Sequence, residues 1–475
     1  MPSTSRHALT ARIRPKHWVV WIAWGLLALW AVWWAMSFAQ PVPKLIQPKE
    51  PPSSLWRYDY LGLDFIHNDA GERTWWSGVN PYLHLYGDPI NPFYVCTPPT
   101  LLFFPWVMAL PPEGTVQSHE HNALPQVIPY PFRAIVVWFV ASVGMIVVAT
   151  LAAAAARRRL GASGGGGEGE GLPLVPIPVM LVAMLFSYPV LFELERGNFN
   201  VLVLLFIALG CLPWLWNRTA PAGAPVAARR WSREIWAGIC LGLAAALKVF
   251  PLILLPGLIV LRKFLAAIVM VATLLLLWLS MFHLTESWSR IAAAIAHEQA
   301  NIIPVAMHSL SISWRHIWGA TVLARVSPAY GSLALLAPPA AIVSWFVFRS
   351  PARNRLMYPY ALWLAALGTC AMMIAVDYNL LLLVMATLIV WDRRDPLWLQ
   401  LLLIPWLLVW QPFQLGPDSF HRTQWFAITL FAMKLWAMLA VGLLVIWRAR
   451  AATAAERSAS AAGAGVTSAG ILRIR

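Results

Sequence analysis

The chain has 475 residues, of which 60% are hydrophobic and only 12% are charged. A soluble domain carries roughly twice that charged fraction, so the composition excludes an ordinary soluble protein. The formal net charge of +15 does not indicate a nucleic-acid-binding surface, because the Lys and Arg residues fall in short clusters beside the ends of apolar runs. That distribution follows the positive-inside rule of membrane proteins.

The first apolar run, residues 18–39, follows a basic leader and ends in Ser37-Phe38-Ala39, which loosely resembles a signal-peptidase site. The run is longer than the apolar segment of a usual signal peptide, and it is long enough to cross a bilayer. It therefore predicts a retained transmembrane helix.

Further apolar runs recur along almost the whole chain. They predict an all-α polytopic membrane protein with about 12 transmembrane helices. The basic clusters place both termini in the cytoplasm. The predicted spans lie near residues 18–39, 132–155, 174–192, 199–216, 235–248, 250–261, 264–283, 328–348, 357–375, 379–391, 397–411 and 425–447.

Two regions do not fit full, upright spans. Residues 95–111 are apolar but short and interrupted by prolines, which predicts an interfacial or re-entrant element. The pair 235–248 and 250–261 is short, and it predicts a shallow hairpin with Lys248-Val249-Phe250-Pro251 at its tip.

The chain is expected to form one membrane domain, residues 1–447, followed by an Ala/Ser-rich cytoplasmic tail, 448–475, that is predicted to be disordered. A Gly-rich sequence within 156–173 predicts a flexible cytoplasmic linker. Two long extracytoplasmic loops are predicted at 40–131 and 284–327. The first loop is expected to contain juxtamembrane helices.

The loop 40–131 combines carboxylates with aromatic side chains, as sugar-binding sites do. A carboxylate near an apolar interface can also have a raised pKa and act as a general base. The alternative is a solvated loop whose aromatic residues form an interfacial belt. The residues concerned are Asp59, Asp64, Asp69, Glu72, Asp88, Trp56, Tyr58, Tyr60, Trp75, Trp76, Tyr82, Tyr86 and Tyr94.

Several motifs occur in a fixed order along the chain: Asp64-Phe65, Gly78-Val79-Asn80-Pro81-Tyr82, Pro98-Pro99, Glu195-Arg196-Gly197-Asn198-Phe199-Asn200, Gly242 to Pro251, and His308-Ser309-Leu310. This ordered set resembles the glycosyltransferases of family 87 in the GT-C superfamily. Those enzymes transfer mannose or arabinofuranose from polyprenyl-phosphate donors in bacterial envelopes. The resemblance implies a GT-C-type helical bundle.

The chain departs from the family pattern at several positions. Thr97 and Thr100 stand where Tyr and Leu are usual, Asn198 replaces Gln, and Tyr378 stands where a His would be. Residues 112–130 look inserted. These departures leave the identity of donor and acceptor open.

The resemblance implies that transfer inverts the anomeric carbon and that Asp64 is the general base that takes the proton of the acceptor hydroxyl. An exposed loop acid is the alternative. The leaving group is then a lipid phosphate, already a stable anion, so no general acid is strictly required. The site must instead position the donor and stabilise its phosphate.

Lys248 and Arg196 are the residues expected to bind that phosphate. Lys248 lies in an otherwise apolar hairpin, and ionisable residues within spans are costly and tend to be functional. A lysine that extends to the membrane interface is the alternative. Arg196 and Asn200 lie in a short turn between two spans, where they could reach phosphate or sugar hydroxyls or could structure the turn.

Four more residues are predicted to contact substrate: Trp76, Tyr82, His308 and Asp377. For His308 the alternative is a solvated loop, and for Asp377 it is a helix cap. Glu193 and Glu195 could bind a divalent ion, but the resembling family works without metal. We therefore expect no metal, and no cofactor besides the lipid-linked sugar donor as co-substrate.

The expected function is transfer of a sugar to an envelope glycolipid or polysaccharide, on the outer face of a bacterial cytoplasmic membrane. The expected partners are the polyprenyl-phosphate sugar, this acceptor and membrane lipids, with no nucleic acid. The alternatives are a transporter or flippase of a lipid-linked saccharide, and a non-catalytic scaffold. Only Lys248 and Lys434 are charged well inside the predicted spans, whereas ion-coupled carriers usually bury more carboxylates.

Overall fold

The computed structural model describes residues 17–39, 62–82, 96–118, 126–161, 175–215, 226–281, 328–370, 377–403 and 424–471. The second long loop, predicted at 284–327, lies outside the described residues, and so does His308. The predicted cytoplasmic linker is described only as far as Gly161.

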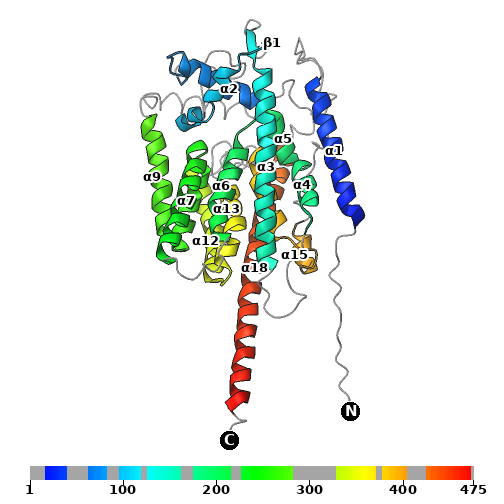
Figure 1. Cartoon of the computed structure of the whole chain (residues 1–475), viewed down its shortest axis with the longest axis vertical. Coiled ribbons are helices and arrows are strands. Elements are labelled where there is room, and N and C mark those ends of the chain that lie inside the picture. Colours follow the sequence, from blue (N-terminus) through cyan, green and yellow to red (C-terminus); the bar gives the residue numbers. More distant parts are fainter. Residues whose placement is uncertain are drawn as a thin grey trace.

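The described chain is mainly helical, and most of its helices pack side by side in a bundle (Figure 1). The α-helices are α1 (His17–Ala39), α2 (Leu63–Trp76), α3 (Phe132–Gly161), α4 (Ile177–Leu185), α5 (Tyr188–Arg196), α6 (Asn200–Leu215), α7 (Val226–Leu247), α8 (Leu254–Val260), α9 (Phe264–Ser280), α12 (Pro328–Arg349), α13 (Arg353–Thr369), α14 (Leu381–Val390), α15 (Leu397–Leu401) and α18 (Gln424–Ile471). Short 3-10 helices are η1 (Pro98–Leu102), η2 (Pro105–Ala109), η3 (Phe250–Ile253) and η7 (Asp377–Leu380).

Three of the described helices are long and apolar enough to cross a membrane, within α1, α3 and α18. A fourth crossing results if α4 and α5 are counted together, although they are bent by 69°. The bend lies at Phe186 and Ser187, just before Pro189, whose ring cannot continue a preceding helix. The predicted helical membrane architecture is thus confirmed, but the predicted number of twelve transmembrane helices is not.

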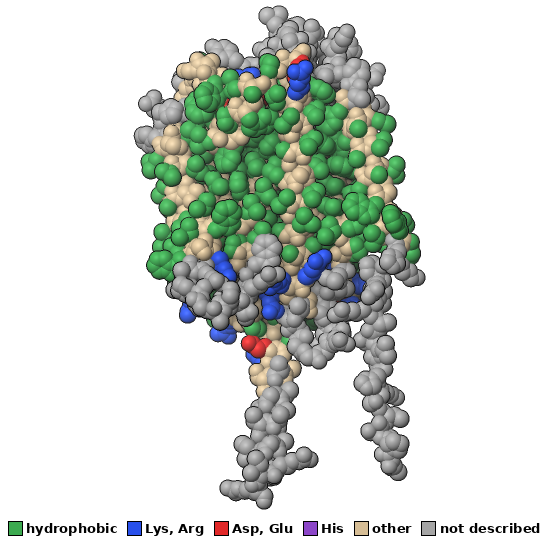
Figure 2. All heavy atoms as spheres, viewed as in Figure 1, with side chains coloured by type: hydrophobic (Ala, Val, Ile, Leu, Met, Phe, Trp, Pro, Cys, Tyr) green, Lys and Arg blue, Asp and Glu red, His purple; other side chains and the backbone are tan. Residues whose placement is uncertain are grey.

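The surface of the bundle matches a lipid environment. Figure 2 shows a broad band of hydrophobic side chains across the middle of one face, with most of the visible Lys and Arg side chains along its lower margin. Large apolar residues on α1 and α9, including Trp21 and Leu276, are mostly exposed. Such extensive apolar exposure would be unfavourable in water, so the bundle is membrane-embedded.

Helices α7 and α9 pack with unusually close backbones. A Cβ atom on Gly238 would lie 2.6 Å from the Cβ of Val269, and one on Gly242 would lie 2.6 Å from the Cβ of Thr273. Small residues four positions apart allow this approach between membrane helices. Helix α7 begins at Val226, so the short arm predicted at 235–248 is wrong in its length, while the predicted break at Lys248 is confirmed.

Two arginines, one buried and one partly buried, hold the C-terminal end of α14. Arg157 of α3 donates from Nη1 to the backbone oxygens of Leu388 (2.9 Å) and Trp391 (2.6 Å). Arg448 of α18 donates from Nε to the oxygen of Val390 at 2.7 Å. These guanidinium groups bind the carbonyls that the C-terminal end of α14 leaves unpaired.

The tail after Arg448 differs from the expected disordered segment. It continues α18 as helix as far as Ile471 and extends below the bundle (Figure 1). The physical reason is its alanine content, because alanine has the highest intrinsic helix propensity.

The first loop contains local structure at the upper end of Figure 1, where α2 and β1 are labelled. Two strands, β1 (Gly114–Ser118) and β2 (Gln126–Tyr130), pair as an antiparallel hairpin with Gly114 opposite Tyr130. This hairpin occupies the segment that looks inserted relative to the family, and a purely α-helical architecture did not anticipate it.

The proline-rich segment 95–111 forms η1 and η2, two five-residue 3-10 helices rather than a spanning helix. Arg73 fastens α2 to this segment: its Nη2 donates to the backbone oxygens of Val107 (3.1 Å) and Leu110 (2.8 Å). The same guanidinium holds Asp69 through two hydrogen bonds of 2.8 and 2.9 Å. Helix α2 is therefore fixed to the proline-rich segment at its far end from Asp64.

Candidate active site

Asp64 lies in the first turn of α2 and meets the turn between α5 and α6. Its Oδ1 forms an ion pair with Arg196, the last residue of α5. Its Oδ2 accepts a hydrogen bond of 2.6 Å from Nδ2 of Asn198, 134 positions later in the sequence. The side chains of Asp64 and Arg196 are 15% and 18% exposed, so the pair is largely shielded but still accessible.

The turn that carries these residues requires a glycine at position 197. Gly197 adopts φ +66°, a left-handed conformation that L side chains rarely take, and it ends α5. A Cβ there would lie 2.8 Å from the Cβ of Phe65, the neighbour of Asp64. Trp138 of α3 fixes the same turn by donating from Nε1 to the oxygen of Gly197 at 3.0 Å.

Gly197→Ala is therefore expected to displace α2 from the turn and to lower any reaction that depends on Asp64 by about 10- to 100-fold, since a shift of about 1 Å at a reacting group has that effect. The measurement is kcat of the purified variant. Gly144→Ala in α3 is the matched control, because nothing lies within 4 Å of a Cβ at that position. Equal activities of the two variants would contradict the close approach between Gly197 and Phe65.

Behind Asp64 lies a second carboxylate, Glu193, which is buried at 1% exposure. Its Oε1 accepts from the backbone N–H of Val201 at 3.1 Å, and its Oε2 accepts from Nδ2 of Asn200 at 3.1 Å. Asn200 is itself fully buried. The structure therefore places the Asn200 amide on Glu193 and Asn198 rather than at an open surface.

Lys248 lies immediately after the end of α7 and is half-buried. Its Nζ is 4.3 Å from the centre of the Phe199 ring, and it interacts electrostatically with Glu193. Within the described part of the chain it forms no salt bridge. A half-buried ammonium group beside an aromatic ring is suited to bind an incoming anion.

Thr97, one of the departures from the family pattern, connects the first loop to the C-terminal end of α7. Its Oγ1 donates to the backbone oxygens of Ala246 (2.6 Å) and Leu247 (3.1 Å), which directly precede Lys248. The hydroxyl thus joins the proline-rich segment to the C-terminal end of α7. It performs a positional role that the sequence alone did not reveal.

The other predicted site residues are placed differently. Tyr82 is buried and its hydroxyl donates to the backbone oxygen of Cys96 at 2.6 Å, while Trp76 is 57% exposed at the end of α2. Asp377 begins η7, which packs against α5, the helix that carries Arg196.

The structure thus brings Asp64, Arg196, Asn200 and Lys248 into one region and adds Glu193 and Asn198 to it. Asn198 was visible in the sequence as a motif position, and Glu193 only as half of an E-x-E pair.

Two acids of α2 are buried away from Asp64. Burial raises the pKa of Asp69, although its contacts with Arg73 act in the opposite direction. Burial also raises the pKa of Glu72 to about 8, against smaller opposing effects from Trp76 and the backbone N–H of Phe104. Neither Glu72 oxygen has a donor in good hydrogen-bond geometry within the described residues. Glu72 is thus expected to be protonated at neutral pH.

The stability of the protein should depend on this proton. Folded Glu72 keeps its proton up to about pH 8, whereas in an unfolded chain its ordinary pKa is 4.5. The folded state therefore binds more protons between these values, and the free energy of unfolding falls as pH rises through this window. Glu72→Gln removes the effect, so its Tm should exceed that of the wild type by several degrees at pH 9 but not at pH 4.5. Thermal unfolding in detergent at both pH values measures this, and a constant Tm difference would contradict it.

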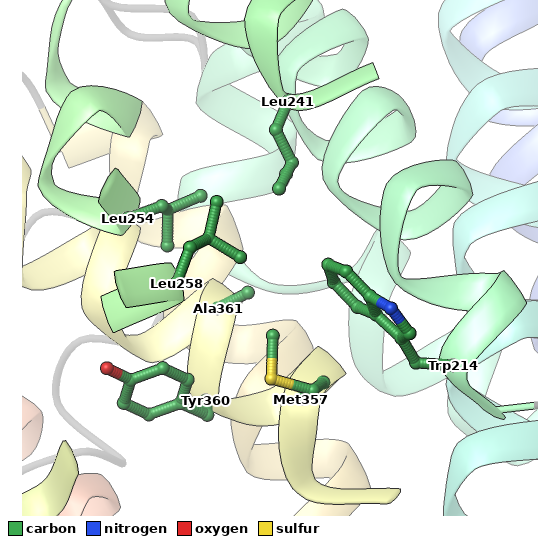
Figure 3. Close-up of a pocket in the computed structure, with 7 residues that line it drawn as sticks. All are labelled: Trp214, Leu241, Leu254, Leu258, Met357, Tyr360 and Ala361. Carbon is green, nitrogen blue, oxygen red and sulfur yellow. The ribbon is translucent and has the colours of Figure 1, made fainter. Parts of the chain in front are cut away.

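The bundle also contains a small cavity remote from Asp64. Side chains from α6, α7, α8 and α13 face one another around it (Figure 3). Its volume is about 10 Å³, at the lower limit for one water molecule. The lining residues are Trp214, Leu241, Leu254, Leu258, Met357, Tyr360 and Ala361. An apolar void of this size cannot hold a sugar, so it is a packing defect and not a substrate site.

Comparison with known proteins gives one match. The sequence profile of glycosyltransferase family 87 matches residues 123–376, which is slightly more than half of the chain. No curated protein and no solved structure matches. The matched residues include Arg196, Asn198 and Lys248, whereas Asp64 precedes them. Because the match covers more than half of the sequence, the chain belongs to glycosyltransferase family 87.

Proposed function

We propose that the protein is an inverting glycosyltransferase that moves a mannose- or arabinofuranose-like sugar from a polyprenyl-phosphate donor to an envelope glycolipid or polysaccharide. The observation that carries this proposal is the convergence of one accessible carboxylate, Asp64, with the cations Arg196 and Lys248 at the turn between α5 and α6. A carboxylate supplies a base, and adjacent cations supply a phosphate site.

In this mechanism the acceptor hydroxyl attacks the anomeric carbon on the face opposite the phosphate. Asp64 takes the hydroxyl proton while the new carbon–oxygen bond forms. The bond between the anomeric carbon and the phosphate oxygen breaks, and its electron pair leaves with the lipid phosphate. The proton thus goes to Asp64 and the negative charge goes to the lipid phosphate, so the reaction needs no general acid.

Arg196 and Lys248 would stabilise the charge that develops on that phosphate. A guanidinium group carries five N–H donors in a planar fork, so Arg196 can hold a carboxylate and contact a phosphate at the same time. Lys248 offers a compact ammonium group beside the Phe199 ring. The ion pair with Arg196 supports this proposal because it would hold the Asp64 carboxylate in a fixed position.

The site would face the extracytoplasmic side of a bacterial cytoplasmic membrane. Support comes from the arginines: Arg157, near the C-terminal end of α3, and Arg448 both bind the C-terminal end of α14, and this end of α3 lies opposite α2 in the bundle (Figure 1). Cytoplasmic ends of membrane helices carry an excess of Lys and Arg. A lipid-linked donor anchored in the outer leaflet would then reach Asp64 from the membrane.

Radiolabelled transfer by the purified, reconstituted protein tests this function. Synthetic polyprenyl-phosphate mannose and polyprenyl-phosphate arabinofuranose serve as donors, each with an envelope glycolipid extract as acceptor. We expect labelled acceptor with one of the two donors and none without protein. Movement of the donor between leaflets with no transfer would instead favour a flippase.

A further inference from the structure

A chain of buried polar side chains runs from Asp64 to Glu193. Asn198 donates to Asp64 Oδ2 at 2.6 Å, Asn200 Nδ2 lies 3.2 Å from Asn198 Oδ1, and the same nitrogen lies 3.1 Å from Glu193 Oε2. Asn198, Asn200 and Glu193 are each at most 4% exposed. The buried end of this chain is a carboxylate, although sugar transfer at Asp64 does not itself require a second acid.

The orientation of the Asn198 amide is fixed by its neighbours. Its Oδ1 accepts from the backbone N–H of Phe199 at 2.8 Å and from Asn200 Nδ2. Because these two donors hold the amide oxygen of Asn198, its amide nitrogen must face Asp64. The reversed amide would place its oxygen against the carboxylate, which is repulsive.

Asn200 is oriented in turn by Glu193. Its Nδ2 carries two protons and has two acceptors, Asn198 Oδ1 and Glu193 Oε2, whereas its buried Oδ1 has no hydrogen-bond partner within the described residues. Leaving a buried oxygen unsatisfied is unfavourable. The observed orientation therefore depends on the two bonds made by the nitrogen, one of which Glu193 provides.

We infer that Glu193 is a positioning residue for the catalytic base: through Asn200 and Asn198 it fixes the amide that holds Asp64. This inference rests on the proposed function of Asp64. Glu193 is also close enough to interact electrostatically with both Lys248 and Asp64.

Glu193→Gln tests the inference because it keeps the shape and changes only the hydrogen-bonding pattern. An amide has a single accepting oxygen, so either Val201 N–H or Asn200 Nδ2 then faces an NH₂ group. Rotation of the Asn200 amide would transmit the change to Asn198. We expect kcat to fall about 10- to 100-fold, while the donor KM stays close to the wild-type value, because the variant leaves Lys248 in place.

A double-mutant cycle with Asn198→Ala separates positioning from general destabilisation. If Glu193 acts through Asn198, adding Glu193→Gln to Asn198→Ala should lower kcat by less than about twofold more. Full additivity, or wild-type kcat in Glu193→Gln, would overturn the inference. Glu234→Gln, which also removes a buried carboxylate, is the control and should leave kcat unchanged.

Two further variants distinguish failure of this inference from misfolding and from failure of the proposed function. If Glu193→Gln does not fold, as judged by thermal unfolding, Asn200→Ala interrupts the same chain and should give the same loss of kcat; a folded Asn200→Ala with wild-type kcat would overturn the inference. Asp64→Asn is measured in parallel. Wild-type transfer by Asp64→Asn overturns the proposed function itself, whereas an inactive Asp64→Asn beside a fully active Glu193→Gln overturns only the role of Glu193.

Discussion

Asp64→Asn is expected to lower kcat by about 10²- to 10⁴-fold, the usual contribution of a general base. The substitution keeps the size of the side chain, but an amide cannot take the proton of the acceptor hydroxyl. It also removes the negative charge that pairs with Arg196. The measurement is initial-rate transfer at saturating donor and acceptor by purified protein, with thermal unfolding to show that the fold is kept.

The control for this variant is Glu113→Gln, which removes another carboxylate from the same loop, one that pairs with Arg133 at 3.1 Å. It should retain transfer close to the wild-type rate, because a partly exposed ion pair contributes little. Wild-type kcat in Asp64→Asn would reject Asp64 as the base. Equal losses in both variants would point instead to a general effect of charge in the loop.

Lys248→Met should raise the KM for the polyprenyl-phosphate donor by about 10- to 100-fold, which corresponds to the loss of one hydrogen bond to a charged group. Methionine keeps the length and apolar character of the side chain next to Phe199 but carries no charge. Because phosphate charge also increases as the leaving group departs, kcat should fall as well. The KM for the acceptor should change less than the KM for the donor.

Lys263→Met is the matched control for this experiment. Lys263 also carries its ammonium group over an aromatic ring, 5.4 Å from the centre of Trp214, but it lies at the opposite end of α8 from the Lys248 turn. Donor KM should be unchanged in this variant. An unaltered donor KM in Lys248→Met would show that Lys248 serves the packing of the turn and not the phosphate.

Three of the departures from the family pattern now have physical descriptions. Thr97 bonds to the end of α7, and Asn198 donates a hydrogen bond to Asp64. The extra segment at 112–130 forms a β-hairpin. None of these differences replaces Asp64, Arg196 or Lys248, the residues on which the proposed function rests.

The sequence by itself determined that the protein is a helical membrane protein and that it belongs to a glycosyltransferase family. Both properties depend on local information: apolar runs of sufficient length, basic residues beside them, and short motifs. The sequence also located the break at Lys248 and the non-spanning nature of the proline-rich segment, because Pro and charged residues interrupt membrane helices wherever they occur.

Only the tertiary structure decided how these parts form a site. Asp64 and Asn198 are 134 positions apart, and no local pattern pairs them. The burial of Glu72 and Glu193 could not be predicted either, since a glutamate in the sequence can be exposed or buried in the fold. Burial and hydrogen bonding arise when distant helices pack together, and they set the charge and direction of each side chain.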